Sequence, residues 1–512
     1  MTEPPEQLEP TPHLREADPQ LEPTGALAKL GYAPSEPEPE RGDLWILLKV
    51  SGPIMVATIS RAVMQFVDFV MVSQLDAATE AQAAVGASGV TLFILIGFWI
   101  GVMTCVNTFS SQSLGRDQPH ECGAYVWQSI YVSVAAGVLA IPLLPLAPPL
   151  FRYFDHGSEV VPLEIIYLQI GLFGVGPMTM GVALSNFFNG VHRPRVTMLS
   201  ALGANIFNVV ANYILIFGNP SLGIPAMGVA GAALGTLLAM IFRAGWLLTA
   251  LLWPYYAERF GTRRMWRWDW SKARNLLRVG LPAGLQFAFD VMAWSVFMMW
   301  LVGRFGPNHL AASNIAWQFC HLSFMPALGI GIALTAVVGK AIGQNRPDRA
   351  RRRATIALGC CGSYMAACGL AFFVFRTFFV GLLAENSDVL HIGEQLMICG
   401  AIFQVSDAMC LVYNSALRGA GDTVWTAVVL VITCWVILIG GGYALAQTMP
   451  ELGALGPWIA ATSYVTVLGL ILAGRWWRGR WEQIDIFASK GQPALPDETM
   501  PSTQTVAPAE GA

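Results

Sequence analysis

Residues 84–110 read AVGASGVTLFILIGFWIGVMTCVNTFS, a run of 27 residues without Asp, Glu, Lys or Arg. A membrane-spanning helix needs about 20 consecutive apolar residues to cross a hydrocarbon layer of about 30 Å, so this run is long enough to span a bilayer. Inside the bilayer the backbone polar groups must bond to one another, which a helix achieves within a single segment. The run therefore predicts a transmembrane helix in an integral membrane protein.

The composition of the whole chain agrees with this prediction. Of its 512 residues, 54% are hydrophobic and only 12% are charged, whereas soluble proteins carry about 25% charged residues. The net charge of −3 offers no basic surface to a nucleic acid, and no G-x-x-x-x-G-K-[ST] loop is present for a nucleotide phosphate. The nine cysteines include no C-x-x-C and predict neither a zinc site nor a disulfide framework. We expect neither an enzyme nor a nucleic-acid-binding protein, and no cofactor.

Apolar runs of similar length recur along the chain, separated by short polar breaks. They predict an all-α integral membrane protein with twelve transmembrane helices. The expected spans are residues 44–72, 84–110, 125–149, 160–189, 196–217, 228–254, 275–303, 310–340, 355–381, 391–417, 423–447 and 454–476.

The distribution of Lys and Arg predicts how these spans are oriented. With a cytoplasmic N-terminus, the cytoplasmic segments hold 25 of the 30 Lys and Arg residues, mostly in 259–278 and 340–353. The loops on the opposite side hold three, which are Arg152, Arg304 and Arg376. We therefore expect a multi-pass protein of the plasma membrane with both termini in the cytoplasm.

The two ends of the chain differ from the part between them. Residues 1–43 contain ten acidic residues and nine prolines, and such a segment cannot bury enough apolar surface to offset its chain entropy. Residues 478–512 are also rich in Pro and polar residues, so we predict a disordered tail at each end. Between the tails, residues 44–256 and 275–477 form two six-helix bundles joined by a basic cytoplasmic linker, residues 257–274.

The second bundle repeats the first at an offset of 228–229 residues. Matching positions include Pro53 with Pro282, Gly101 with Gly329, and Leu114-Gly115 with Ile342-Gly343. Because six spans separate the copies, both copies keep the same orientation in the membrane. Two pseudo-symmetric parallel bundles with a shared cleft are typical of alternating-access carriers.

Charged side chains at membrane depth are costly and usually functional. We place five of them at membrane depth, which are Arg61, Asp68, Arg243, Asp290 and Asp407. At about 1.5 Å per residue, Asp290 and Asp407 lie roughly 15–24 Å from the cytoplasmic face, near the midplane. Neither recurs in the first half, where the equivalent residues are Ala62 and Thr179, so we interpret both as specialised for binding a cation. Arg61 and Asp68, seven residues apart, are either functional or a structural ion pair.

Neutral polar side chains extend the candidate cavity for a cation or substrate. Asn205, Asn208 and Asn212 share one helical face, where they either line this cavity or form hydrogen bonds between helices. The remaining candidates are Arg61, Gln286, Gln404, Ser406 and Asn414. Aromatic and Met side chains near the acidic residues are expected to form an apolar wall suited to organic cations: Phe66, Trp294, Met298, Trp317 and Phe403.

Five short motifs carry a resemblance to a known family. They are Phe66-Val67-Asp68, Leu281-Pro282 followed by Asp290, Gln404-Val405-Ser406-Asp407, LRGAGDT at residues 417–423 and NYILIFG at residues 212–218. Through them, residues 44–477 resemble the MATE (multidrug and toxic compound extrusion) family in its bacterial NorM-type branch.

The resemblance implies a monomeric carrier of the bacterial inner membrane that exports cationic or amphiphilic small molecules in exchange for Na⁺ or H⁺. It also implies that Asp290 and Asp407 are the cation ligands of the second bundle and would bind Na⁺ in a sodium-coupled protein. Asp68 is the corresponding cation or proton site of the first bundle. Two departures leave the coupling ion open: Asn212 stands where one branch has Asp, and Asp290 stands where Glu is commoner.

A second function from the same wider superfamily is a flippase for lipid-linked precursors. Such flippases usually have a more basic central cavity and often more than twelve helices. The acidic residues at the midplane and the count of twelve spans therefore favour the antiporter.

Overall fold

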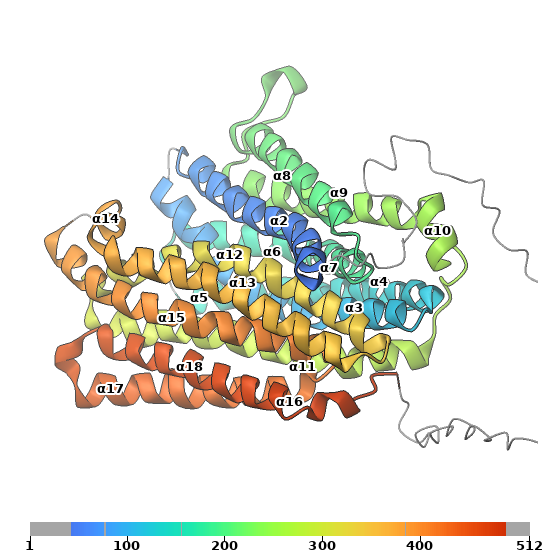
Figure 1. Ribbon diagram of the computed structural model, residues 1–512. Coiled ribbons are helices and arrows are strands. Elements are labelled where there is room, and N and C mark those ends of the chain that lie inside the picture. The colour runs from blue at the N-terminus through green and yellow to red at the C-terminus, as the bar shows by residue number, and fades with distance from the viewer. Residues whose placement is uncertain (1–41, 76–77, 155, 385, 488–512) are drawn as a thin grey trace, which may run out of the picture.

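The structure, a computed structural model, describes residues 42–75, 78–154, 156–384 and 386–487. The predicted N-terminal tail therefore lies outside the described residues up to residue 41, and the C-terminal tail from residue 488. Throughout the described part the regular structure is helical, apart from an isolated bridge between Asn219 and Ile224. This confirms the expected all-α class (Figure 1).

The first half of the chain contains the helices that correspond to predicted spans one to six. They are α2 (Asp43–Val72), α3 (Ala78–Gly115), α4 (Pro119–Ala140), η1 (Ile141–Leu146), α5 (Ala147–Phe154), α6 (Val160–Phe173), α7 (Val175–Gly190), α8 (Pro194–Phe217), η2 (Pro220–Leu222), α9 (Gly228–Leu252) and α10 (Pro254–Phe260).

The second half contains the helices that correspond to spans seven to twelve. They are α11 (Trp270–Val296), η3 (Phe297–Val302), η4 (Gly303–Phe305), α12 (Pro307–Gly343), α13 (Pro347–Val374), α14 (Arg376–Gly381), α15 (Ser387–Ala420), α16 (Thr423–Thr433), η5 (Cys434–Gly441), α17 (Gly442–Thr448), η6 (Pro450–Leu452), α18 (Leu455–Trp477) and η7 (Arg480–Gln483).

Eleven helical segments of the described chain are long and apolar enough to cross a membrane, and a bent pair supplies a twelfth span. The pair is α6 and α7, which meet at an angle of 47°. Pro177 lies three residues after the break, where it cannot donate a backbone hydrogen bond and its ring excludes the carbonyl of Phe173. The bend therefore has a local cause in the sequence, and the twelve helical segments occupy the predicted spans.

The two halves pack through equivalent helices. Helix α3 of the first half packs on α11 of the second, and α12 packs on α2 in the same way. Gly101 lies against the backbone of Ala283 and Gly284, while its repeat partner Gly329 lies against Met55. Since Met55 and Gly284 are 229 residues apart, these two contacts are one contact repeated by the internal symmetry.

Gly115 and Gly343 mark the axis that relates the halves. They are equivalent in the repeat, and each lies against the other's Cα. A side chain on Gly115 would overlap the carbonyl oxygen of Lys340, and one on Gly343 would overlap that of Gln112. Both residues end their helices, so α3 and α12 cross closely here only because neither carries a Cβ atom.

The segment after α18 differs from the predicted disordered tail. Trp481 is fully buried and stacks on Trp476 with ring centroids 4.2 Å apart. Further on, Phe487 packs against Phe109 of α3 and Tyr125 of α4. Residues 478–487 thus pack against both halves of the molecule through their aromatic side chains. The Pro-rich composition of the tail as a whole did not indicate this packing.

Candidate functional site

Asp68 lies within the first half, on α2, and faces α8. Asn212 donates a hydrogen bond from its side-chain nitrogen to Asp68 Oδ1 at 2.8 Å, and a second to Asn208 Oδ1 at 3.3 Å. Asn208 and Asn212 are buried, while Asn205, nearer the start of α8, bonds to Ser60 at 3.0 Å. Asn205 and Asn212 therefore join α8 to α2, while Asn208 bonds to Asn212 on the same helix.

Within the described residues, Arg61 does not form the ion pair with Asp68 that was considered from the sequence. Arg61 is exposed. It lies one helical turn after Thr58, which donates a hydrogen bond to the Met325 carbonyl of α12. Arg61 also lies close enough to Arg243 of α9 for the two charges to interact. Arg243 donates a hydrogen bond to Ser185 at 3.0 Å. The first half thus contains basic groups as well as Asp68 at membrane depth.

Asp290 and Asp407 come together in the second half. Asp290 lies on α11 and Asp407 on α15, and the two carboxyl groups are close enough for their charges to interact. Tyr464 of α18, which is buried, donates a hydrogen bond to Asp290 Oδ1 at 3.5 Å. In the part of the chain that the structure describes, neither aspartate forms an ion pair with a basic side chain. Two like charges without a counter-ion in an apolar bundle favour the binding of a cation or a proton between them.

The neutral candidates of the second half lie on the same two helices as this pair, α15 and α11. Gln404 donates to Ser323 of α12 at 2.6 Å, and Ser406 shares a hydrogen bond with Thr466 of α18 at 2.8 Å. Gln286 is buried on α11, one turn before Asp290. The side-chain carbonyl oxygens of Gln404 and Asn414 are buried and accept no hydrogen bond. Buried oxygens without donors are groups that a bound cation would satisfy.

The predicted aromatic wall is only partly assembled. Trp294 packs against Trp317 at 4.7 Å between ring centroids and against Phe403 at 6.0 Å, and the same indole contacts Tyr464. These rings fill the interior of the second half beside Asp290. Phe66 lies far along α2 in the first half and is 67% exposed, so it is not part of this cluster.

The halves meet through their predicted cytoplasmic portions. Hydrogen bonds between them run from Asn107, Thr108 and Gln112 of α3 to backbone carbonyls of α12 and α15. On α2, the contacts with the second half extend from Asp43, paired with Arg353, to Thr58. These contacts lie toward the predicted cytoplasmic ends of α2 and α3. Farther along α3, the ring of Phe93 also meets that of Phe287 on α11, with 6.0 Å between the ring centroids.

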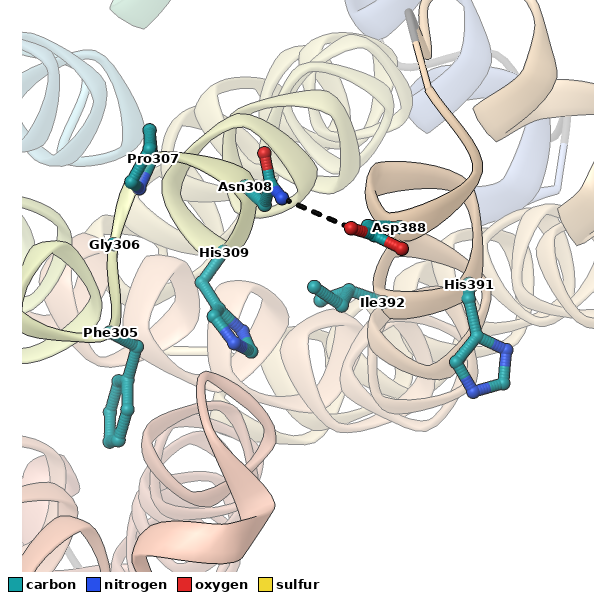
Figure 2. A pocket seen from close by; sticks show the side chains of 8 residues that line it. All are labelled: Phe305, Gly306, Pro307, Asn308, His309, Asp388, His391 and Ile392. Carbon is teal, nitrogen blue, oxygen red and sulfur yellow. Dashed lines mark hydrogen bonds between the residues drawn. The ribbon is translucent and has the colours of Figure 1, made fainter.

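A hollow of 360 Å³ lies at the opposite ends of the helices (Figure 2). It is bounded by the starts of α12 and α15, where Asn308 donates to Asp388 at 3.5 Å. His309 points toward the hollow and His391 lies at its edge in the same view. No predicted site residue lines it, so this surface hollow is separate from the buried carboxylates.

The sequence reasoning missed three polar groups. Tyr464 was overlooked because a tyrosine within an apolar span has no charge to attract notice. Glu164 is buried on α6, where it bonds to His156 at 2.7 Å and leaves its second oxygen without a donor. It lies inside the predicted span 160–189 and was signalled by the same rule that selected Asp68. Thr466, the partner of Ser406, could not be predicted, because a threonine within an apolar span is not unusual.

Comparison with known families gives a match in each half of the chain. The family model MatE matches residues 53–214 and again residues 282–444. The two matches begin 229 residues apart, which is the offset of the internal repeat.

Curated relatives cover most of the chain. The protein of Idiomarina loihiensis called probable multidrug resistance protein NorM is 26% identical over 442 residues, which are 85% of this chain and 94% of the relative. The protein of the same name from Bacillus subtilis is 27% identical and covers 81% of this chain and 90% of its own length. Multidrug resistance protein PmpM of Pseudomonas aeruginosa is 28% identical, with 80% and 85% covered.

Solved structures share the fold. An outward-facing multidrug resistance MATE family transporter of the MOP superfamily superposes with a TM-score of 0.78 at 21% identity, covering 86% of this chain and 97% of its own. A MOP superfamily transporter from Pyrococcus furiosus gives the same TM-score at 22% identity, with 87% and 98% covered. The architecture of two bundles is thus a known one.

Proposed function

The chain belongs to the MatE family, and we propose that it exports cationic or amphiphilic small molecules across the bacterial inner membrane in exchange for Na⁺ or H⁺. Relatives at 26–28% identity are named as multidrug resistance proteins, which supports efflux of small molecules by a carrier that is not an enzyme. The twelve spans place it in the membrane as a multi-pass protein.

The pair of Asp290 and Asp407 is the observation that carries the proposal. Both are acidic, both lie within the second half, and Tyr464 donates a hydrogen bond to Asp290. A monovalent cation bound there would relieve the repulsion between the carboxylates, and a proton would do the same. The unpaired side-chain oxygen of Gln404, which lies one turn before Asp407 on α15, would add a ligand for Na⁺.

Exchange then follows from differential affinity. An ion gradient can drive export when the cation binds one conformation more tightly and the substrate binds the other more tightly. The repeat supplies two bundles that rock against each other, and the crossing at Gly115 and Gly343 supplies the contact that must open. The acidic pair also favours a cationic substrate group, because opposite charges attract in a site with little water.

The test is efflux by the full chain reconstituted in vesicles. A fluorescent cationic dye is loaded, and a Na⁺ gradient at equal pH or a pH gradient without Na⁺ is then imposed separately. We expect one gradient to drive dye movement and an ionophore that collapses it to stop the movement. An anionic dye of similar size serves as the comparison, because Arg61 and Arg243 lie in the first half. A rate of dye movement that is the same with and without either gradient would overturn the proposal.

The orientation belongs to the same proposal. The charge distribution of 25 against three supports cytoplasmic termini. A reporter protein fused after residue 487, which keeps the buried segment 478–487 intact, is expected to read as cytoplasmic. A periplasmic signal would contradict the proposed orientation but would not bear on the proposed substrate.

A further inference from the structure

A second hollow, of 340 Å³, opens on the outer surface of the second half between α16 and α18. These helices lie side by side along one edge of the molecule (Figure 1). Trp425, Leu470 and Ile471 form its apolar lining, and Gly474 leaves open space where a side chain would stand. Three arginines lie at its predicted cytoplasmic end, which are Arg475, Arg478 and Arg480.

The charges around this hollow do not balance. Arg475 is held by Asp422, with Nε 2.8 Å from Oδ2, and its guanidinium lies 4.9 Å from the centre of the Trp425 ring. The other nearby carboxylates are used elsewhere, since Glu482 pairs with Arg351 at 2.7 Å and Asp485 with Arg116 at 3.0 Å.

Arg478 and Arg480 therefore remain exposed, and neither forms an ion pair with an acidic side chain of the described residues. Two guanidinium groups at the rim of one hollow can bind a phosphate group, whose oxygens match their donors.

An apolar surface continues from the hollow toward the membrane interior. Val424, Val428 and Ile432 are spaced four residues apart on α16 and are each more than half exposed. Leu470 of α18 is 60% exposed and lines the hollow itself. Side chains of this kind on the outside of a membrane bundle lie against acyl chains. The surface is thus basic at the interface and apolar beneath it.

We propose that this hollow binds one anionic phospholipid of the cytoplasmic leaflet. Arg478 and Arg480 hold the headgroup phosphate, Arg475 and Trp425 form the wall of the hollow, and the acyl chains follow the apolar stripe of α16. Basic pockets between helices on the cytoplasmic side suit anionic headgroups. The proposal rests on the proposed orientation and is independent of the coupling ion and the exported compound.

The experiment measures lipid binding to the purified full chain by native mass spectrometry. The probes are phosphatidylglycerol, phosphatidylethanolamine and inorganic phosphate, each titrated separately. Arg478→Gln with Arg480→Gln removes the headgroup contacts, and Gly474→Phe fills the hollow without a change of charge. Arg264→Gln with Arg267→Gln is the matched control, because both arginines are exposed in the linker and equally remove two positive charges.

We expect the wild-type chain to retain one phosphatidylglycerol in preference to phosphatidylethanolamine. Removing two basic side chains next to an anionic headgroup should weaken that binding by about tenfold or more. Gly474→Phe should weaken it as well, and the linker control should not. Equal binding of the two lipids, wild-type binding by both pocket variants, or equal loss in the linker control would overturn the proposal. Displacement of the lipid by inorganic phosphate would assign the site to free phosphate instead.

Discussion

Asp407 allows the role of the acidic pair to be tested with little change in shape. Asp407→Asn removes the charge from α15 and keeps the size of the side chain, so we expect gradient-driven dye efflux to fall to the level seen without a gradient. Vesicle efflux at matched protein content is the measurement. Asp388→Asn, on the same helix at its exposed outer end, is the control and should transport normally. Wild-type efflux by Asp407→Asn would mean that the coupling cation binds elsewhere.

Asn212 offers a stability test at the same scale. Asn212→Ala leaves the Asp68 carboxylate without the donor at 2.8 Å, and a hydrogen bond to a charged group contributes about 1.5–3 kcal/mol. We expect thermal unfolding in detergent to occur at a lower temperature for this variant. Asn205→Ala loses only a bond to a serine hydroxyl, worth about 0.5–1.5 kcal/mol, and should shift the transition less. The reverse order of the two variants would contradict this interpretation of Asp68.

Single residues also show where sequence reasoning reaches its limit. Helical periodicity placed Asn208 and Asn212 on one face, and both are buried toward α2. The asymmetry of the repeat singled out Asp290 and Asp407, whose carboxyl groups are close enough for their charges to interact. Tyr464 could not be found this way, because its approach to Asp290 depends on how α18 packs against α11. Contacts between distant helices come from packing, and packing leaves no local pattern in the sequence.

At the scale of helices, span positions followed from apolar length alone, because the bilayer fixes how long a helix must be. Bends and π-helical segments within the spans were harder to predict from the sequence. The bend at Pro177 follows from a proline, but the π-helical segments Phe297–Val302 and Cys434–Gly441 have no such marker. Segments of this kind often occur at functional sites, and Cys434 lies within electrostatic reach of Asp290.

The crossing of α3 and α12 gives a prediction about conformation. Gly343→Ala places a methyl group where the carbonyl oxygen of Gln112 lies, so the two helix ends must separate. Spin labels on Gln118 and Asp348 should report a larger distance across the cytoplasmic side, measured by pulsed electron resonance. Gly359→Ala is the control, since a side chain there meets open space. An unchanged distance in Gly343→Ala would show that the crossing does not hold this side closed.

The segment after α18 gives a second prediction at this scale. Arg116, the residue after the end of α3, pairs with Asp485 at 3.0 Å and lies over the Phe487 ring at 4.2 Å. Arg116→Asp puts two acidic groups together and should loosen the segment, seen as faster hydrogen exchange in residues 480–487. Adding Asp485→Arg restores opposite charges and should slow the exchange again, although the effect is modest because the pair is partly exposed. If hydrogen exchange in the double variant is as fast as in the single variant, the ion pair is not what holds the segment in place.

For the molecule as a whole, the hydrogen bonds and ion pairs between the halves gather toward one end of α2 and α3. Asp43 and Thr58 mark their extent on α2, and Gly115 meets Gly343 at the end of α3. The repeat makes this contact nearly symmetric, while the acidic pair belongs to one half alone. A symmetric hinge can rock the bundles, and an asymmetric site makes the rocking depend on an ion. Coupling therefore requires both features in one chain.

This arrangement predicts reciprocal competition between cation and substrate. If one conformation holds the cation at Asp290 and Asp407 and the other holds the exported compound, each ligand must weaken the other by the same factor. We expect the affinity of purified protein for a fluorescent cationic dye to fall as Na⁺ is raised at fixed pH, or as pH is lowered without Na⁺, whichever ion is coupled. Asp290→Asn should bind the cation more weakly and lose most of this competition, while dye binding itself persists. A wild-type dye affinity that is indifferent to both titrations would mean that the two aspartates are structural and that export is not coupled to either ion.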